Sequence, residues 1–237
     1  MKRACAWPSA LLAVAIALLP LSVLSAETPT RITVGSKAFT ELVILAEVLH
    51  HLARHAGAEA VHQRQLGGTR VVWNALLSGD IDAYPEYTGT LLRESLADEN
   101  LCTQAELQQA LATRGVRMTD SLGFNNSYAI GVKQSLARQL DLHRISDLKN
   151  HPELVFGFGN EFMDRADGWP GLQRRYGLPQ TNVRGLDHDL AYRGLAAGSL
   201  DAIDLYSTDA EIAYYDLLAL DDDLLEVLGP AQGDGGL

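Results

Sequence analysis

The sequence is poor in cysteine and in basic residues, and each shortage excludes a class of protein. Only two of the 237 residues are cysteines, Cys5 and Cys102. Because we expect Cys5 to leave with the leader described below, no internal disulfide can form. Lysine and arginine number 19 against 30 aspartate and glutamate residues, so the net charge is −11. We therefore expect neither nucleic acid nor anionic lipid as a partner. A cationic ligand, or simply an acidic surface that aids solubility, fits this charge.

The sequence also lacks an apolar run of the ~20 residues that a membrane helix needs. The run at 11–19 follows two basic residues and precedes the small pair Ser25-Ala26, an order typical of a secretory signal peptide. We predict that residues 1–26 are this leader and that the mature chain begins near Glu27. The mature chain is expected in the periplasm without membrane insertion, and no cysteine beside the cleavage site supports lipid attachment.

Motifs of common enzyme classes are missing as well. The sequence has no nucleophile elbow, Walker motif or dinucleotide fingerprint, since Gly67-Gly68 lacks the full spacing. Asp82 and Glu86 could suggest a carboxylate pair for glycoside hydrolysis. However, Asp82 has a counterpart in the repeat described below, which favours a structural role. We predict a protein that is not an enzyme and has no cofactor.

Three histidines on one predicted helix raise the question of a zinc site. His51 and His55 lie one helical turn apart, with His50 beside them. A zinc site would need a third ligand from elsewhere, no HExxH-type sequence is present, and the solvent-facing side of the helix would hold these residues comfortably. We therefore expect no metal site.

What the sequence does contain is an internal repeat. ALLSGDIDAYPEYTGT at 75–90 and GLAAGSLDAIDLYSTD at 194–209 each describe an amphipathic helix, a glycine, a short apolar segment and a loop with a tyrosine. This order is the second half of a βαβ unit, so we expect two similar α/β lobes. A constant offset aligns Leu76 with Leu195, Gly79 with Gly198, Asp82 with Asp201, Ala83 with Ala202, Tyr87 with Tyr206 and Thr88 with Ser207.

The periodicity of apolar residues places the elements of both lobes. The first lobe is predicted to have strands at 31–34, 61–65 and 81–84 and helices at 40–55 and 69–77. The second is predicted to have strands at 128–132, 154–158, 182–185 and 200–205 and a helix at 190–197. Loops at the carboxyl ends of such strands should converge on a shared cleft, namely 35–37, 85–90, 159–165 and 205–209.

Five segments in fixed order resemble the substrate-binding proteins of ABC importers for glycine betaine, choline, carnitine and related osmoprotectants. These segments are VGSKAFTELVILAE, LGGTRVVWNALLSGDIDAYPEYTGT, NNSYAIGV, GNEFMDRADGWPGLQRRYG and LYSTDAEI. The resemblance implies an α/β, two-lobed periplasmic binding protein fold of type II. Each lobe would be a mixed sheet flanked by helices, with the ligand in the cleft between the lobes. It also implies a monomer that delivers a quaternary ammonium compound to the permease subunits of an ABC transporter. A ligand-sensing module is the alternative, but it would need a fused signalling or membrane segment, and none is recognisable.

The resemblance divides the chain and assigns its ending. Lobe one is expected at 27–125, lobe two at 126–210, and a return toward lobe one at 211–237. Relatives continue through a proline- and tyrosine-bearing stretch and further helices, whereas residues 221–237 have no aromatic residue. We therefore expect a shortened C-terminus, by truncation or a shifted reading frame, which would weaken lobe one and the affinity for the ligand.

A quaternary ammonium group has no N–H donor, so proteins bind it on aromatic faces. Tyr87, Tyr128 and Tyr206 lie at strand ends, and in the resembled family tyrosines at these positions form the cage around the ammonium group. Packing between elements is the alternative role for such tyrosines. Asn126 and Glu161 match positions that flank the cage in the resembled family, which implies that Glu161 acts as a countercharge.

A carboxylate tail needs cationic or N–H donors opposite the cage. The candidates are Lys37, Thr90 and Arg165. Arg165 offers a planar fork, and Lys37 precedes a helix N-terminus that favours an anion. As alternatives, Lys37 is only a solvated loop charge and Arg165 pairs with Asp164 or Asp167. The sequence does not choose among glycine betaine, choline, carnitine and proline betaine.

Overall fold

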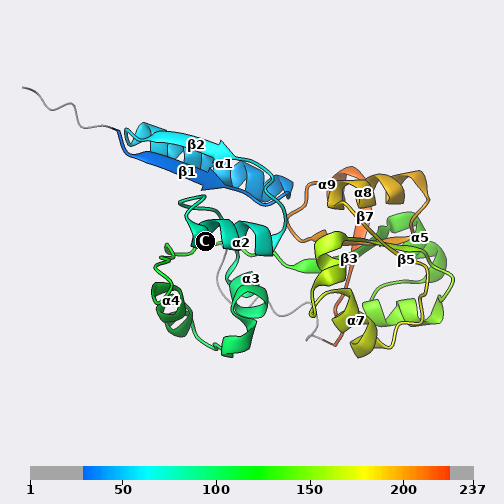
Figure 1. Cartoon of the computed structure of the whole chain (residues 1–237). Helices are drawn as coiled ribbons and strands as arrows, with labels where there is room; N and C mark the ends of the chain where they lie inside the picture. Colours follow the sequence, from blue (N-terminus) through cyan, green and yellow to red (C-terminus); the bar gives the residue numbers. More distant parts are fainter. Residues whose placement is uncertain (1–28, 225–237) are drawn as a thin grey trace, which may run out of the picture.

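The computed structural model describes residues 29–224, whose helices and strands form two α/β lobes (Figure 1). The predicted leader at 1–26 and the final residues, 225–237, lie outside the described residues. Among residues 29–224, no helix is both long and apolar enough to cross a membrane. The alternation of strands and helices confirms the expected α/β class.

Lobe one is built on a two-stranded parallel sheet of β1 and β2, which α1 contacts. The predicted third strand at 81–84 is reduced to a single bridge, in which Ala83 pairs with Val34. Its core gathers Trp73, Leu91 and Leu107 between α2 and α4. The elements are β1 (Arg31–Gly35), α1 (Thr40–His55), β2 (Glu59–Gln63), α2 (Thr69–Ser78), α3 (Thr88–Thr90), the π-helical turn η1 (Leu91–Ser95), the 3-10 turn η2 (Ala97–Glu99) and α4 (Gln104–Ala112).

Lobe two is built on a five-stranded mixed sheet in the order β5-β4-β6-β3-β7. β4 runs parallel to β5 and β6, whereas β3 is antiparallel to β6 and β7. Phe156, Phe158 and Phe162 are fully buried in its main core. The elements are β3 (Tyr128–Lys133), α5 (Gln134–Leu140), the 3-10 turn η3 (Ile145–Asn150), β4 (Phe156–Gly159), α6 (Asn160–Asp164), α7 (Trp169–Tyr176), β5 (Val183–Leu186), α8 (His188–Ala197), β6 (Ala202–Tyr206), α9 (Glu211–Tyr214) and β7 (Leu217–Leu220).

The internal repeat has the same backbone geometry in both lobes. α2 ends at Gly79 and α8 at Gly198, both in the left-handed conformation with φ of 79° and 75°. This conformation strains residues with a side chain, which explains the repeated glycine. Asp82 then accepts the backbone N–H of Thr33 at 2.7 Å, and Asp201 accepts that of Val155 at 2.8 Å. Each aspartate therefore ties the second half of its unit to the first strand, as the structural interpretation of Asp82 predicts.

The end of the described chain differs from the predicted division. β7 pairs antiparallel with β3 and so extends the sheet of lobe two. The described part of 211–237 therefore packs on lobe two rather than returning toward lobe one. Antiparallel pairing next to β3 satisfies backbone groups that an edge strand would leave exposed.

Candidate functional site

Two of the predicted cage tyrosines lie side by side in lobe two. Tyr128 begins β3 and Tyr206 ends β6, and the antiparallel register places them directly opposite each other. Their rings are 4.8 Å apart at 36°, and their hydroxyl oxygens are 3.0 Å apart. Burial raises the pKa of both hydroxyls, so both remain neutral phenols at neutral pH. The pair presents an uncharged aromatic surface of the kind that binds cations.

Lobe one adds an aromatic ring that the sequence analysis missed. Phe39, the residue immediately before α1, meets Tyr206 edge-on at 5.4 Å between ring centroids. His188, the first residue of α8, lies 4.9 Å from the Tyr206 ring and 6.0 Å from Phe39. Phe39 lies within the segment VGSKAFTELVILAE, and His188 follows the end of β5. Their positions in the sequence could therefore have identified both as candidate site residues.

His188 brings a positive charge to this aromatic group. Its Nε2 lies 3.0 Å from Asp209 and its Nδ1 lies 3.7 Å from Asp204. Burial disfavours the charged ring, but these two carboxylates outweigh burial and raise the pKa of His188 to about 10. At neutral pH the group is therefore an imidazolium that two aspartates hold in place.

Arg165 and Glu161 bring opposite charges next to the tyrosines. The guanidinium of Arg165 lies over the Tyr128 ring, 5.8 Å from its centroid, and is only 5% exposed. Its Nε and Nη2 donate to the carboxylate of Asp167 at 2.8 and 2.7 Å, so the alternative pairing with Asp167 is realised. Nη1 lies 4.0 Å from Glu161 Oε1 and has no hydrogen-bond partner among residues 29–224.

Glu161 also joins the two lobes. Its Oε1 accepts a short hydrogen bond from the hydroxyl of Thr69, which begins α2 in lobe one. Its Oε2 is buried and has no partner in the described chain. Buried polar atoms are normally hydrogen-bonded, so unpartnered atoms in a cleft mark places where a ligand's polar atoms can bind.

Lys37 lies in an environment that differs from both predictions, which were a cation facing the ligand carboxylate and a solvated loop charge. Its Nζ lies 2.7 Å from Glu86 Oε1, and both side chains are almost fully buried, at 3% and 2% exposure. Burial raises the pKa of Glu86 while Lys37 opposes that shift. The solvated-loop alternative is therefore wrong, and the ammonium group is already paired with a carboxylate of its own lobe. Glu86 Oε1 also accepts the backbone N–H of Tyr87 at 2.8 Å.

Tyr87 and Asn126 come together where the chain passes between the lobes. The amide nitrogen of Asn126 donates to the Tyr87 hydroxyl and to Glu41, both at 3.0 Å. Tyr87 also meets Phe124 edge-on. Thr90 lies in α3 and makes no side-chain hydrogen bond to another predicted site residue within the described ranges.

A cavity of about 1030 Å³ opens between the lobes beside these groups. Lobe one lines it with Phe39 and with most residues of 65–71, and lobe two with several residues from each of 159–165 and 186–193. Of the predicted site residues, Glu161 and Arg165 line this cavity. Tyr128, Tyr206 and Tyr87 are not among its lining residues.

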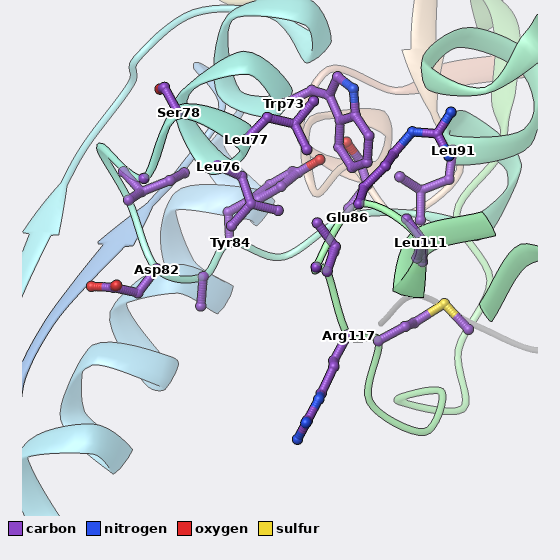
Figure 2. Close-up of a pocket in the computed structure, with 17 residues that line it drawn as sticks. Trp73, Leu76, Leu77, Ser78, Asp82, Tyr84, Glu86, Leu91, Leu111 and Arg117 are labelled. Carbon is purple, nitrogen blue, oxygen red and sulfur yellow. The ribbon is translucent and has the colours of Figure 1, made fainter. Parts of the chain in front are cut away.

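A second cavity of about 580 Å³ lies within lobe one (Figure 2). Figure 2 shows Leu76 and Tyr84 on one side of it and Leu91 and Leu111 on the other, with Glu86 between them. None of the predicted site residues lines it. Its walls come from one lobe, so it is separate from the cleft.

Comparison with known proteins identifies the family of the chain. Residues 30–233 match the family model described as the substrate binding domain of ABC-type glycine betaine transport system. The chain belongs to this family. That membership and the solved structure described below support the two-lobed binding-protein fold predicted from the sequence.

Named relatives fall in the same group. The chain is 32% identical over 221 residues to an ergothioneine transport permease/ergothioneine binding protein of Helicobacter pylori. This match covers 90% of this chain and 39% of that protein. It is 32% identical over 202 residues to a carnitine transport binding protein of Listeria monocytogenes, covering 81% of this chain and 65% of that protein. The chain thus spans less than two thirds of the length of both relatives. A solved structure, described as a glycine betaine/carnitine/choline ABC transporter, is 30% identical with a TM-score of 0.61; the match covers 83% of this chain and 75% of that one.

Proposed function

We propose that this protein captures a quaternary ammonium osmoprotectant outside the cytoplasm and delivers it to the permease of an ABC transporter. Membership of the glycine betaine family supports this function, as do relatives whose names mention ergothioneine and carnitine transport. In this proposal residues 1–26 direct export to the periplasm. The mature chain acts as a monomer that binds without chemical conversion and needs no cofactor.

The observation that carries the proposal is the contact of Arg165 with Tyr128. A guanidinium already lies over this ring, so the ring face accepts a cation inside the folded protein. Its buried Nη1 has no partner, which suits one oxygen of a ligand carboxylate. A zwitterion carries both charges, and these groups could bind each of them.

We assign the roles in the site accordingly. The rings of Tyr87, Tyr128 and Tyr206, extended by Phe39, contact the ammonium group, and Glu161 is its countercharge. Arg165 binds the carboxylate, while Asn126 and Thr90 offer further hydrogen bonds. Lys37 acts indirectly, because it neutralises Glu86 and so holds the loop that carries Tyr87.

Calorimetric titration with glycine betaine, carnitine, ergothioneine, proline betaine and choline tests the proposal. Choline has the ammonium group but no carboxylate, so Arg165→Gln should weaken glycine betaine binding strongly and choline binding little. Arg138→Gln, an exposed arginine on α5, is the matched control. Failure of every compound to bind a folded protein, or conversion of a compound during titration, would contradict the proposed function.

A further inference from the structure

A cluster of nitrogen and oxygen ligands lies on lobe one, apart from the cleft. Glu47, His50 and His51 project from the same part of α1, because residues three and four apart share a helix face. The Oε1 atom of Glu47 is 3.4 Å from His50 Nδ1 and 3.4 Å from His51 Nε2. Tetrahedral zinc with bonds of about 2.0–2.1 Å places neighbouring ligand atoms about 3.4 Å apart.

We propose that Glu47, His50 and His51 form a binding site for Zn²⁺. In the sequence, His51 and His55 lie one helical turn apart, and no third ligand is evident from the spacing. The structure supplies Glu47 from the preceding turn of the same helix, and His55 does not belong to the cluster. The proposal is independent of the ligand in the cleft, since none of the predicted cleft residues takes part.

The tautomer of His50 supports a bound cation. His50 Nε2 lies 3.2 Å from the carbonyl oxygen of Ala60, which can only accept a hydrogen bond. The neutral ring therefore carries its proton on Nε2 and directs a lone pair from Nδ1. This Nδ1 atom is buried and has no hydrogen-bond partner within residues 29–224. A lone pair facing the carboxylate of Glu47 repels it unless a proton or a metal ion lies between them.

Hydrogen bonds from outside the cluster orient Glu47. Its Oε2 accepts from His62 Nδ1 at 2.7 Å and from Arg64 at 2.8 Å. Oε1 is therefore left for the metal, and such outer partners orient ligands in known metal sites.

The site is open to solvent, which can supply a water ligand. His51 is 66% exposed as a side chain, whereas His50 and His62 are 14% and 3% exposed. Three protein ligands with one open position match zinc sites that keep a bound water. On its inner side, His62 Nε2 contacts Ser36 Oγ at 3.1 Å, in the loop that precedes Phe39.

The test is titration of the full chain with ZnCl₂ after EDTA treatment, followed by calorimetry and thermal melting, with Mg²⁺ and Ca²⁺ as control ions. We expect one Zn²⁺ per chain and a raised melting temperature, with no response to the control ions. His51→Ala should lower the zinc affinity by about tenfold or more, and the exposure of His51 makes it safe for folding. His55→Ala, on the same helix and exposed, is the matched control and should bind as wild type.

Replacement of Zn²⁺ by Co²⁺ gives a second readout, because tetrahedral Co²⁺ absorbs visible light strongly and octahedral Co²⁺ does not. We expect that absorption in the wild type and its loss in Glu47→Gln and His50→Ala. Absence of 1:1 zinc binding would overturn the proposal. Equal loss in His55→Ala and His51→Ala would overturn it too, because it would place the metal elsewhere.

Discussion

The buried ion pair of Lys37 and Glu86 offers a sharp test of the geometry of lobe one. Both side chains are at most 3% exposed, and Glu86 Oε2 has no hydrogen-bond partner among the described residues. Lys37→Met therefore leaves a buried carboxylate without its counterion. Removal of one partner from such a pair costs about 3–5 kcal/mol of unfolding free energy. We expect a loss in this range at pH 7.

The double variant Lys37→Met/Glu86→Leu separates charge from packing. Replacing both partners by apolar side chains removes the unpaired charge, and such replacements are often neutral or stabilising. The double variant should therefore be more stable than Lys37→Met alone. Urea unfolding of the wild type, both single variants and the double variant measures the coupling between the two residues.

The pH dependence of Lys37→Met follows from the same pair. Burial already raises the pKa of Glu86, and loss of Lys37 removes the charge that opposes this shift. A carboxyl whose folded pKa is raised stabilises the fold at low pH, and that contribution is lost as pH rises through the raised pKa. The deficit of the variant should therefore grow from pH 4 to pH 7. A cost below about 1 kcal/mol at pH 7, or a deficit that shrinks as pH rises, would refute the burial argument.

Three further outcomes are expected. The pKa of His188 is raised to about 10, so the stability that its charge contributes is fully present below its ordinary pKa of about 6.5 and is lost as pH approaches 10. Urea unfolding should therefore show that the wild type loses stability more steeply from pH 7 to 10 than His188→Gln does. Equal slopes would contradict this. Tyr87→Ala and Tyr206→Ala should weaken ligand binding by about 1–2 kcal/mol, and the Phe variants much less, because the ring face carries the cation–π contact. Calorimetry measures these affinities. If a hydroxyl hydrogen bond mattered instead, the Ala and Phe variants would lose affinity equally. Asp82→Ala and Asp201→Ala should each cost about 1–3 kcal/mol in thermal or urea unfolding, since each leaves a backbone N–H without its acceptor. No cost in either variant would mean that water replaces the carboxylate.

The repeat and the strand ends could be predicted because local chemistry determines them. α1 spans the predicted 40–55, and the glycine that ends α2 needs a left-handed backbone. The tyrosines at 128 and 206 were placed by the same rule, since residues at strand ends gather at one edge of a sheet. In contrast, 81–84 looked like a strand from its apolar alternation, but only Ala83 pairs within the described lobe.

The partners of the charged residues could not be predicted, because they depend on contacts between distant segments. Lys37 and Glu86 are 49 positions apart, and Thr69 and Glu161 are 92 apart. Spacing within a motif carries no information about such pairs. The sequence therefore indicated candidate groups for the cleft but not which of them are already neutralised.

The two lobes hold their equivalent tyrosines in the same way with different residues. In lobe one, Glu86 accepts the backbone N–H of Tyr87 and is neutralised by Lys37. In lobe two, Asp209 accepts the backbone N–H of Tyr206 and is neutralised by His188. The repeat aligns the tyrosines, but it does not align either carboxylate or cation.

Each tyrosine loop is therefore fixed by a carboxylate with its own buried cation. This matters for the ligand, because a carboxylate that already has a cation attracts a second one weakly. Arg165 and Glu161 differ from Lys37 and Glu86 because both line the cavity between the lobes, and each keeps one buried atom without a hydrogen-bond partner in the described chain. In the proposed site these two residues supply one cation and one anion beside neutral rings. A zwitterion satisfies both, whereas a simple cation leaves Arg165 Nη1 unpaired. On this reasoning the cleft should prefer glycine betaine or carnitine to choline.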